Sequence, residues 1–248
     1  MGHSDHRKNE VISLQTSTIS SIIQQARSEG REFLTEDEAK AIIAARGIPV
    51  VSCQVAGDED EALLLADKIG YPVVLKVRSP VLVHKSDCGG VRLDLADRAS
   101  LSAAYREIIA RAASLDPDAS VTVQPMAPRG TEVLIGVTVD RQFGPVVAFG
   151  LGGVFTEVLK DFSFRLAPIG PEEAGRMLRQ IKGWRLLQGY RGGPAVDTGA
   201  LEQMIAEVSR LAVEVEDIAE LDLNPVAAYP DGALALDARI RIKEKECG

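Results

Sequence analysis

The chain has 248 residues, of which 46% are hydrophobic, so it can form a substantial core in one large domain or two small ones at roughly 150 residues per domain. The 36 acidic and 28 basic residues give a formal net charge of -8, and only 4% of the residues are aromatic, which argues against a general nucleic-acid-binding protein. Three cysteines without a metal-binding spacing favour a reducing cytoplasm, and neither a signal peptide nor a membrane span of roughly 18 apolar residues is expected.

Helical periodicity and strand-like runs alternate through the first half of the chain, after a leader over residues 1–16 that is expected to be disordered. The expected elements are a helix over 17–30, a helix that follows a capping box of Thr35 and Glu38 and stops at Gly47, an extended piece over 48–55, a helix from Asp58 to Gly70, strands over 71–77 and 91–95, and a helix over 98–114. The run Asp116-Pro117-Asp118 marks the best internal boundary.

Beyond this boundary, strand-like runs are joined by short glycine-rich connections. The expected elements are strands over 121–124, 132–139, 146–149 and 154–159, a helix that starts at Gly170-Pro171, a long amphipathic helix over 199–215, and short strands about Asn224-Pro225 and over 233–237. The pattern predicts an α+β fold with two subdomains, 17–118 and 119–242, and a tail over 243–248.

Lys76 stands inside the apolar run VVLKV, where alternation places its side chain on the same face as Val74. A lysine at such a position loses hydration unless an anion meets it, although a side chain that snorkels to the strand edge is an equal alternative.

The next segment, HKSDCGGV over residues 84–91, predicts a loop between two strands. Its paired glycines let backbone N–H groups turn toward a phosphate, although paired glycines in such a loop are usually only a turn. From Tyr71 to Arg92 four basic residues stand against one acidic residue, a local charge of +3 that suits a polyphosphate. His84 is a candidate nucleophile or base, or an ordinary hydrogen-bonding residue.

Near the C-terminus, Glu220, Asp222 and Asn224 share one face of a predicted strand, and Asp237 lies on a neighbouring one. Because Mg²⁺ prefers one or two carboxylate or amide oxygens together with phosphate oxygens and water, Asn224 and Asp237 are candidate ligands. A solvated sheet face is the alternative.

Eight short motifs, in this order, resemble the ATP-grasp domain of the ADP-forming acyl-CoA synthetase family, in its β subunit, and more distantly the succinyl-CoA synthetase β subunit. They are YPVVLKV (71–77), HKSDCGGV (84–91), VQPM (123–126), GTEVLIG (130–136), GLGGVFTE (150–157), YRG (190–192), ELDLNP (220–225) and LDARI (236–240). The resemblance covers roughly residues 17–242 and implies an ATP-grasp fold, in which two α+β subdomains hold the nucleotide between them.

For the nucleotide, ATP or ADP, the resemblance implies that Lys76 contacts the α- and β-phosphates and that Lys85 and the loop of Gly89 and Gly90 cover the phosphates. It implies an adenine hinge formed by Gln124, Pro125 and Met126. Glu132 would lie at the nucleotide, on its ribose side.

For the chemistry, the resemblance implies that Asn224 and Asp237 hold Mg²⁺ with Asp222 assisting nearby. Arg239 would face the transferring phosphoryl group, and His84 would relay that group between the nucleotide and a partner domain. These roles agree with phosphoryl transfer as a reaction that depends on positioning and on neutralisation of charge.

The implied reaction is acyl-CoA + ADP + phosphate ⇌ carboxylic acid + CoA + ATP, through an acyl phosphate and a phosphohistidine. The family's CoA-binding Rossmann domain and its catalytic histidine lie in the α portion, and this sequence has no dinucleotide-type glycine fingerprint and no histidine after His84. The chain is therefore expected to need a CoA-binding α subunit in a hetero-oligomer, or to be a fragment of a longer fusion.

Two other functions are compatible with the motifs. One is a regulatory ATP-binding domain without turnover, as in acetyltransferase fusions, and the other is a stand-alone ATP-grasp ligase with a different acceptor. The presence of Lys76, His84, Asn224 and Asp237 favours chemistry over sensing, and the HKSD motif disfavours another acceptor.

Overall fold

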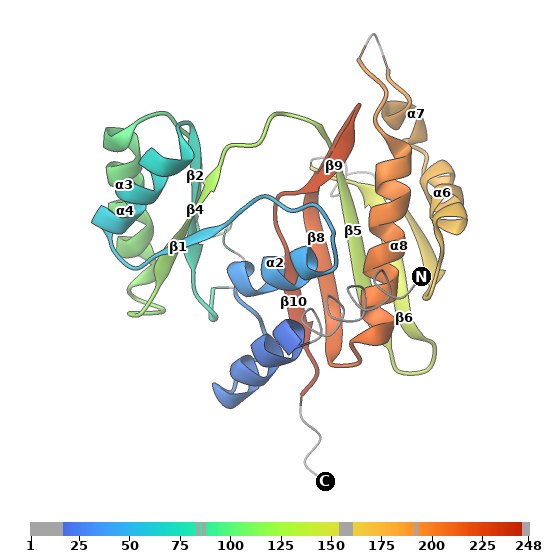
Figure 1. Ribbon diagram of the computed structural model, residues 1–248, viewed down its shortest axis with the longest axis horizontal. Helices are drawn as coiled ribbons and strands as arrows, with labels where there is room; N and C mark the ends of the chain where they lie inside the picture. Colours follow the sequence, from blue (N-terminus) through green and yellow to red (C-terminus); the bar gives the residue numbers. More distant parts are fainter. Residues whose placement is uncertain (1–16, 83–84, 86–87, 154–160, 191–192, 245–248) are drawn as a thin grey trace, which may run out of the picture. The chain divides into compact units, whose positions relative to one another are not determined.

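The computed structural model describes residues 17–82, 85, 88–153, 161–190 and 193–244, and the chain forms two compact units (Figure 1). The smaller unit comprises Thr35–Lys40 and Val51–Pro128, and the larger unit comprises Met1–Leu34, Ala41–Val50 and Arg129–Gly248. Residues 119–128, which the sequence analysis assigns to the second subdomain, fall in the smaller unit in this division. The predicted leader, and residues 245–248 of the predicted tail, lie outside the described residues.

The smaller unit contains a four-stranded antiparallel sheet and two long helices. The strand order is β1 (Gln54–Ala56), β4 (Ser120–Pro125), β2 (Val73–Arg78) and β3 (Val91–Leu95). Helices α3 (Glu59–Ile69) and α4 (Arg98–Ala112) begin after Asp58 and Asp97, whose side chains accept backbone N–H bonds from the first turn. Of the extended piece expected over 48–55, only the last two residues belong to a strand of this sheet, β1.

The two faces of this smaller sheet differ in chemistry. One face packs against α3 and α4 (Figure 1) and carries the fully buried side chains of Val73, Leu75, Val77, Val121 and Val123. Because side chains alternate along a strand, Lys76, Thr122 and Gln124 lie on the other face. The register pairs Lys76 with Thr122, so these side chains are neighbours across β2 and β4.

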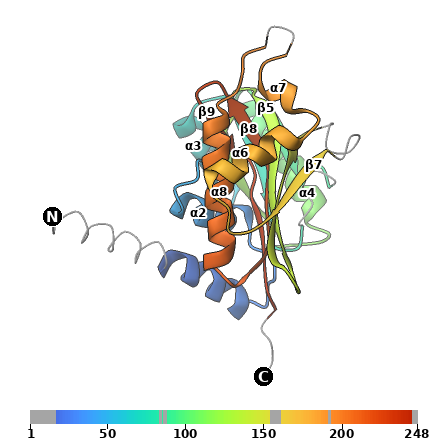
Figure 2. The ribbon, with the colours of Figure 1, turned by 90° about the vertical axis from the view of Figure 1, so that its right-hand side faces the viewer.

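The larger unit contains a six-stranded antiparallel sheet with helices on one face. Its strand order is β10 (Arg239–Ile242), β8 (Ile218–Tyr229), β5 (Thr131–Asp140), β6 (Gly144–Leu151) and β7 (Phe162–Leu166), and β9 (Gly232–Ala235) also pairs with β8. Helices α6 (Pro171–Gln180) and α8 (Thr198–Glu214) lie side by side over this sheet (Figure 2). A helix over 17–28 precedes α2 (Glu36–Ala45), and α7 (Trp184–Leu187) follows α6.

Most predicted elements of the larger unit are confirmed, and the differences lie at β7, β8, β10 and α7. The segment about Asn224-Pro225 is the middle of one long strand, β8, whose register against β5 shifts at this point. Strands β7 and β10 and the short helix α7 were not predicted. The strand expected over 154–159 lies outside the described residues. Among the helices that the structure describes, none combines the length and the apolar character needed to cross a membrane.

Candidate functional site

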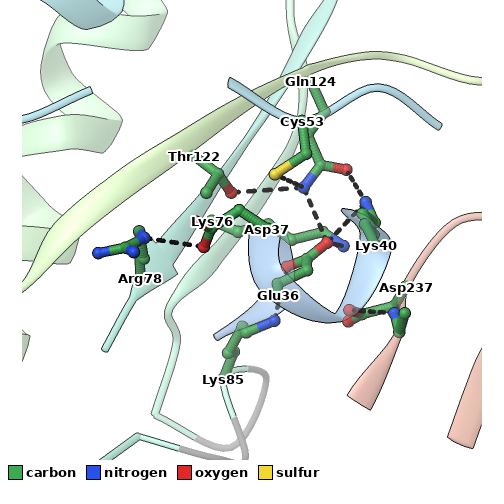
Figure 3. Close-up of polar contacts among 11 residues, drawn as sticks. Glu36, Asp37, Lys40, Cys53, Lys76, Arg78, Lys85, Thr122, Gln124 and Asp237 are labelled. Carbon is green, nitrogen blue, oxygen red and sulfur yellow. Dashed lines mark hydrogen bonds and ion pairs between the residues drawn. The ribbon is translucent and has the colours of Figure 1, made fainter. Parts of the chain in front are cut away.

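Lys76 is buried, with 6% of its surface exposed, and its ammonium group forms an ion pair with Glu36 from the first turn of α2 (Figure 3). Its Nζ donates to Glu36 Oε1 at 2.7 Å. Lys40 donates to the same oxygen at 2.8 Å, and Lys85 donates to Glu36 Oε2 at 2.5 Å. The anion expected to meet Lys76 is therefore a carboxylate of the chain itself, and the snorkelling alternative does not describe this side chain.

Lys40, Lys76 and Lys85 form a lysine cluster about Glu36, and the charges of the cluster shift the pKa values of its members. Burial by itself raises the pKa of Glu36, but the three ammonium groups outweigh burial and hold that pKa well below its usual range. Burial lowers the pKa of Lys40, and the Glu36 carboxylate opposes this effect. The cluster thus concentrates three ammonium groups about one carboxylate, and a concentration of lysines suits a polyanion such as a nucleotide phosphate chain.

The Gln124 side chain belongs to the same cluster. Its Oε1 accepts from Lys40 Nζ at 2.8 Å, and its Nε2 donates to Glu36 Oε1 at 2.8 Å. At the next residues of the predicted adenine hinge, the Met126 N–H donates to the Pro72 carbonyl at 3.1 Å. The side chain of Gln124 thus supports the lysines, and the contact of Gln124, Pro125 and Met126 with adenine stays a prediction.

The glycine loop is held to β2 by backbone hydrogen bonds. The Gly90 N–H donates to the Lys85 carbonyl, and the Val77 N–H donates to the Gly90 carbonyl, both at 2.7 Å. Gly89 has φ +64°, a left-handed conformation that favours glycine. This arrangement joins Lys85 and the two glycines to the strand that carries Lys76, whereas His84 lies outside the described residues.

We expect Gly90→Ala to destabilise the loop, because a Cβ at this position would lie 2.5 Å from Val77 Cγ1 and 3.0 Å from the Lys85 carbonyl oxygen. Overpacking of this kind costs about 1–3 kcal/mol of unfolding free energy. Denaturant unfolding measures this loss. Gly57→Ala is the matched control, since a Cβ there makes only an ordinary contact with the Glu61 side chain at 3.6 Å. Equal stabilities of the two variants would contradict the expectation.

In the larger unit, strand register places Asn224 opposite Asp237. β8 pairs with β10 through Asp222 and Arg239, and with β9 through Val226 and Ala235, in one continuous register. Asp237 was expected on a neighbouring strand, but it lies in the connection between β9 and β10, because the pairing with β8 is interrupted there. The pairs on either side keep the same offset, so Asn224 and Asp237 occupy opposed positions of the interrupted ladder. An amide and a carboxylate in this position fit Mg²⁺, which takes few protein oxygens and completes its shell with phosphate and water.

Asp222 and Arg239 lie beside this pair. Arg239 Nη2 is 3.8 Å from Asp222 Oδ2, a loose ion pair at the end of a row that continues with Glu220 and Arg241 at 2.7 Å. Burial raises the pKa of Asp222, while Arg239 lowers it and Asp237 and Glu220 raise it further. In the described part of the chain, no group of three or more His, Cys, Asp or Glu side chains has a metal-binding arrangement, so any divalent ion held here would depend on its other ligands.

Glu132, predicted on the ribose side of the nucleotide, borders the second glycine-rich turn of the larger unit. Its carbonyl accepts from the Gly152 N–H at 2.8 Å. A Cβ on Gly153 would lie 2.8 Å from Glu132 Oε2, so the carboxylate lies directly over this turn. Glu157 and Arg191, which belong to the quoted motifs, lie outside the described residues.

Sequence reasoning missed Glu36 and Lys40, because Glu36 was treated only as part of a helix start. The capping contact is present, since the Thr35 N–H donates to Glu38 Oε2 at 2.8 Å. Glu36 and Lys40, however, share the buried face of α2 with Ala39, and only 4% and 3% of their surfaces are exposed. Two opposite charges four residues apart, in phase with the apolar stripe, are the signal that indicates a buried polar site.

Comparison with known proteins identifies the family. The chain belongs to the ATP-grasp family, whose domain profile matches residues 25–242. Within it, the chain is homologous to the β subunit of ADP-forming acetate–CoA ligase I of Pyrococcus furiosus, with 46% identity over 222 residues that cover 88% of this chain and 95% of the relative. ADP-forming acetate–CoA ligase I of Archaeoglobus fulgidus is 39% identical over 237 residues, which cover 94% of this chain and 34% of the relative.

A solved structure extends the comparison to the fold. Acetyl-coenzyme A synthetase 1 of Candidatus Korarchaeum cryptofilum, in complex with coenzyme A and Mg-AMPPCP, matches with a TM-score of 0.80 and 44% sequence identity over 91% of this chain and all of the matched chain. Together these relatives confirm the predicted ATP-grasp fold and the predicted similarity to ADP-forming acyl-CoA synthetase β subunits.

Proposed function

We propose that the chain is the nucleotide-binding β subunit of an ADP-forming acid–CoA ligase, which catalyses acyl-CoA + ADP + phosphate ⇌ carboxylic acid + CoA + ATP. The observation that carries the proposal is the largely buried lysine cluster, in which three ammonium groups meet one carboxylate. The homology to ADP-forming acetate–CoA ligase β subunits supports the choice of reaction.

In this proposal the residues of the chain position the phosphates and neutralise their charge. Lys76 and Lys85 donate to phosphate oxygens, and the Gly89-Gly90 backbone covers them. Asn224 and Asp237 hold Mg²⁺, with Asp222 assisting, and Mg²⁺ when bound supplies further neutralisation of the phosphates. Arg239 faces the phosphoryl group in transit, and His84 accepts it for relay to the partner.

The proposed partner is a CoA-binding α subunit. A relative of about this length is named as a β subunit, and this chain covers only 34% of the Archaeoglobus fulgidus ligase. The missing CoA-binding part is expected in a separate chain, or in another part of a fused one. A cytoplasmic location belongs to the same proposal.

The proposal is tested by nucleotide binding and then by turnover. Saturating Mg-ATP at about 100 times its Kd should stabilise the chain by about 2.7 kcal/mol, a shift of several degrees in Tm. With a CoA-binding α subunit added, acetyl-CoA, ADP and phosphate should yield ATP, and without it they should not. Absence of any thermal shift contradicts the proposal, whereas a shift without turnover in the presence of the α subunit favours a regulatory ATP-binding domain.

Asp237→Asn is expected to slow ATP formation about 10²–10³-fold, because the variant loses the negative charge that would hold Mg²⁺ against the phosphates. The rate of the assembled enzyme, measured over a range of Mg²⁺ concentrations, checks this expectation. Asp231→Asn is the matched control, since Asp231 is an exposed acid in the turn between β8 and β9. Equal rates for the two variants would remove Asp237 from the proposed metal site.

A further inference from the structure

We propose that Glu36 is a positioning residue for the phosphate-binding lysines: its buried carboxylate gathers the Lys76 and Lys85 ammonium groups at one place before the nucleotide binds. The inference rests on the proposed function, which assigns Lys76 and Lys85 to the phosphates, and adds to it a residue that touches no nucleotide atom itself.

Two of the contacts of Glu36 anchor its carboxylate, and two others bring the phosphate-binding lysines to it. Lys40 and Gln124 hold the carboxylate through Oε1, at 2.8 Å each, and they also bond to each other at 2.8 Å. Lys76 reaches Oε1 from β2, and Lys85 reaches Oε2 from the glycine loop. Figure 3 shows the two side chains converging on this one carboxylate from different parts of the chain. An ammonium group has three N–H donors, so a bond to Glu36 is compatible with a bond to a phosphate.

Without the carboxylate, the same lysines would repel one another. Their Nζ atoms all lie within 2.8 Å of one of its two oxygens, and like charges held about a single carboxylate repel one another where little water screens them. Lysine stems are long and flexible, so the ammonium groups would move apart. Part of the binding free energy of the nucleotide would then be needed to bring them back together.

Two possible roles of Glu36 predict opposite changes in the affinity for a nucleotide when its carboxylate is removed. If Glu36 were only a negative charge near the phosphates, its removal would strengthen the binding of a polyanion. If it positions the lysines, its removal weakens that binding. A purely structural role would lower the folded fraction, which reduces the apparent affinity for every ligand by the same factor.

The test is the ratio of the affinities for Mg-ADP and adenosine, measured by calorimetry or competition on the full chain. A loss of folded protein lowers both affinities equally and cancels in the ratio, whereas a loss of lysine positioning affects only the ligand that carries phosphates. We expect Glu36→Gln to lower the ratio about tenfold, which corresponds to about 1.4 kcal/mol. Glu36→Asp keeps the charge but draws it back by one methylene, and it should lower the ratio about threefold.

Asp37→Asn is the matched control, because it removes an acidic charge from the same helix turn, where Asp37 pairs with Arg78 rather than with the lysine cluster. Its ratio should equal that of the wild type. An unchanged or increased ratio in Glu36→Gln overturns the inference, and an unchanged ratio in Glu36→Asp does so if the glutamine variant fails to fold. A wild-type chain that binds Mg-ADP no more tightly than adenosine overturns the proposed function, and this inference with it.

Discussion

Replacement of Lys76 by alanine is expected to remove most of the stabilisation that Mg-ATP gives to the chain. In the proposed function the Lys76 ammonium group donates to the α- and β-phosphates, and a hydrogen bond between charged groups contributes about 1.5–3 kcal/mol. Its loss therefore weakens nucleotide binding by a factor of about 10–10². The position is favourable for such an effect, because Lys76 is almost fully buried and its ammonium group is fixed by Glu36.

The measurement is the change in Tm on addition of Mg-ATP, compared between Lys76→Ala and the wild type. Lys68→Ala is the matched control, since Lys68 is an exposed lysine in the last turn of α3 within the same unit. The nucleotide-free Tm of each variant separates a loss of binding from a loss of folding. A thermal shift in Lys76→Ala as large as in the wild type would exclude Lys76 from the phosphate site.

Lys76 could be predicted from the sequence because its environment is local. A lysine inside a run of buried strand residues stands out against its immediate neighbours, and alternation gives the face on which it lies. Glu36 could not be assigned in the same way, because its lysine partners on β2 and in the glycine loop are 40 and 49 positions further along the chain. Only the folded unit brings these residues together.

In the larger unit, too, some features could be predicted from the sequence and others could not. The residue types of Asn224 and Asp237 predict a metal pair, and the hairpin of β8 and β9 continues in register into β10, which places the two residues opposite each other. The sequence did not predict that β8 runs unbroken through Pro225, because proline usually interrupts a strand pattern. Strand β7 was missed although FSFRL alternates apolar and polar residues as a strand does. The segment has only five residues, and its alternation is inverted relative to burial, since Phe164 and Leu166 are exposed and Ser163 is buried.

Glu36 is also expected to link the stability of the smaller unit to pH. Its pKa in the folded chain is held well below the usual value of 4.5, because the attraction of three lysines outweighs the cost of burial. A carboxyl group whose pKa is lower in the folded than in the unfolded chain stabilises the fold fully above its unfolded pKa. That contribution declines as the pH falls below this value toward the lower folded pKa, because the unfolded chain takes up the proton first.

Glu36→Gln should therefore lower the unfolding free energy by about 3 kcal/mol at about pH 7, since the buried Lys40 and Lys76 and the partly buried Lys85 lose their counter-ion. The cost lies at the lower end of the range for a broken buried ion pair, because lysine stems can move toward water. The difference from the wild type should shrink at about pH 3, where the contribution of the wild-type carboxylate has declined. Urea unfolding at both pH values measures it, with Asp37→Asn as the control for loss of one acidic charge. A difference that stays constant between the two pH values would show that Glu36 stabilises the unit by packing and not by its charge.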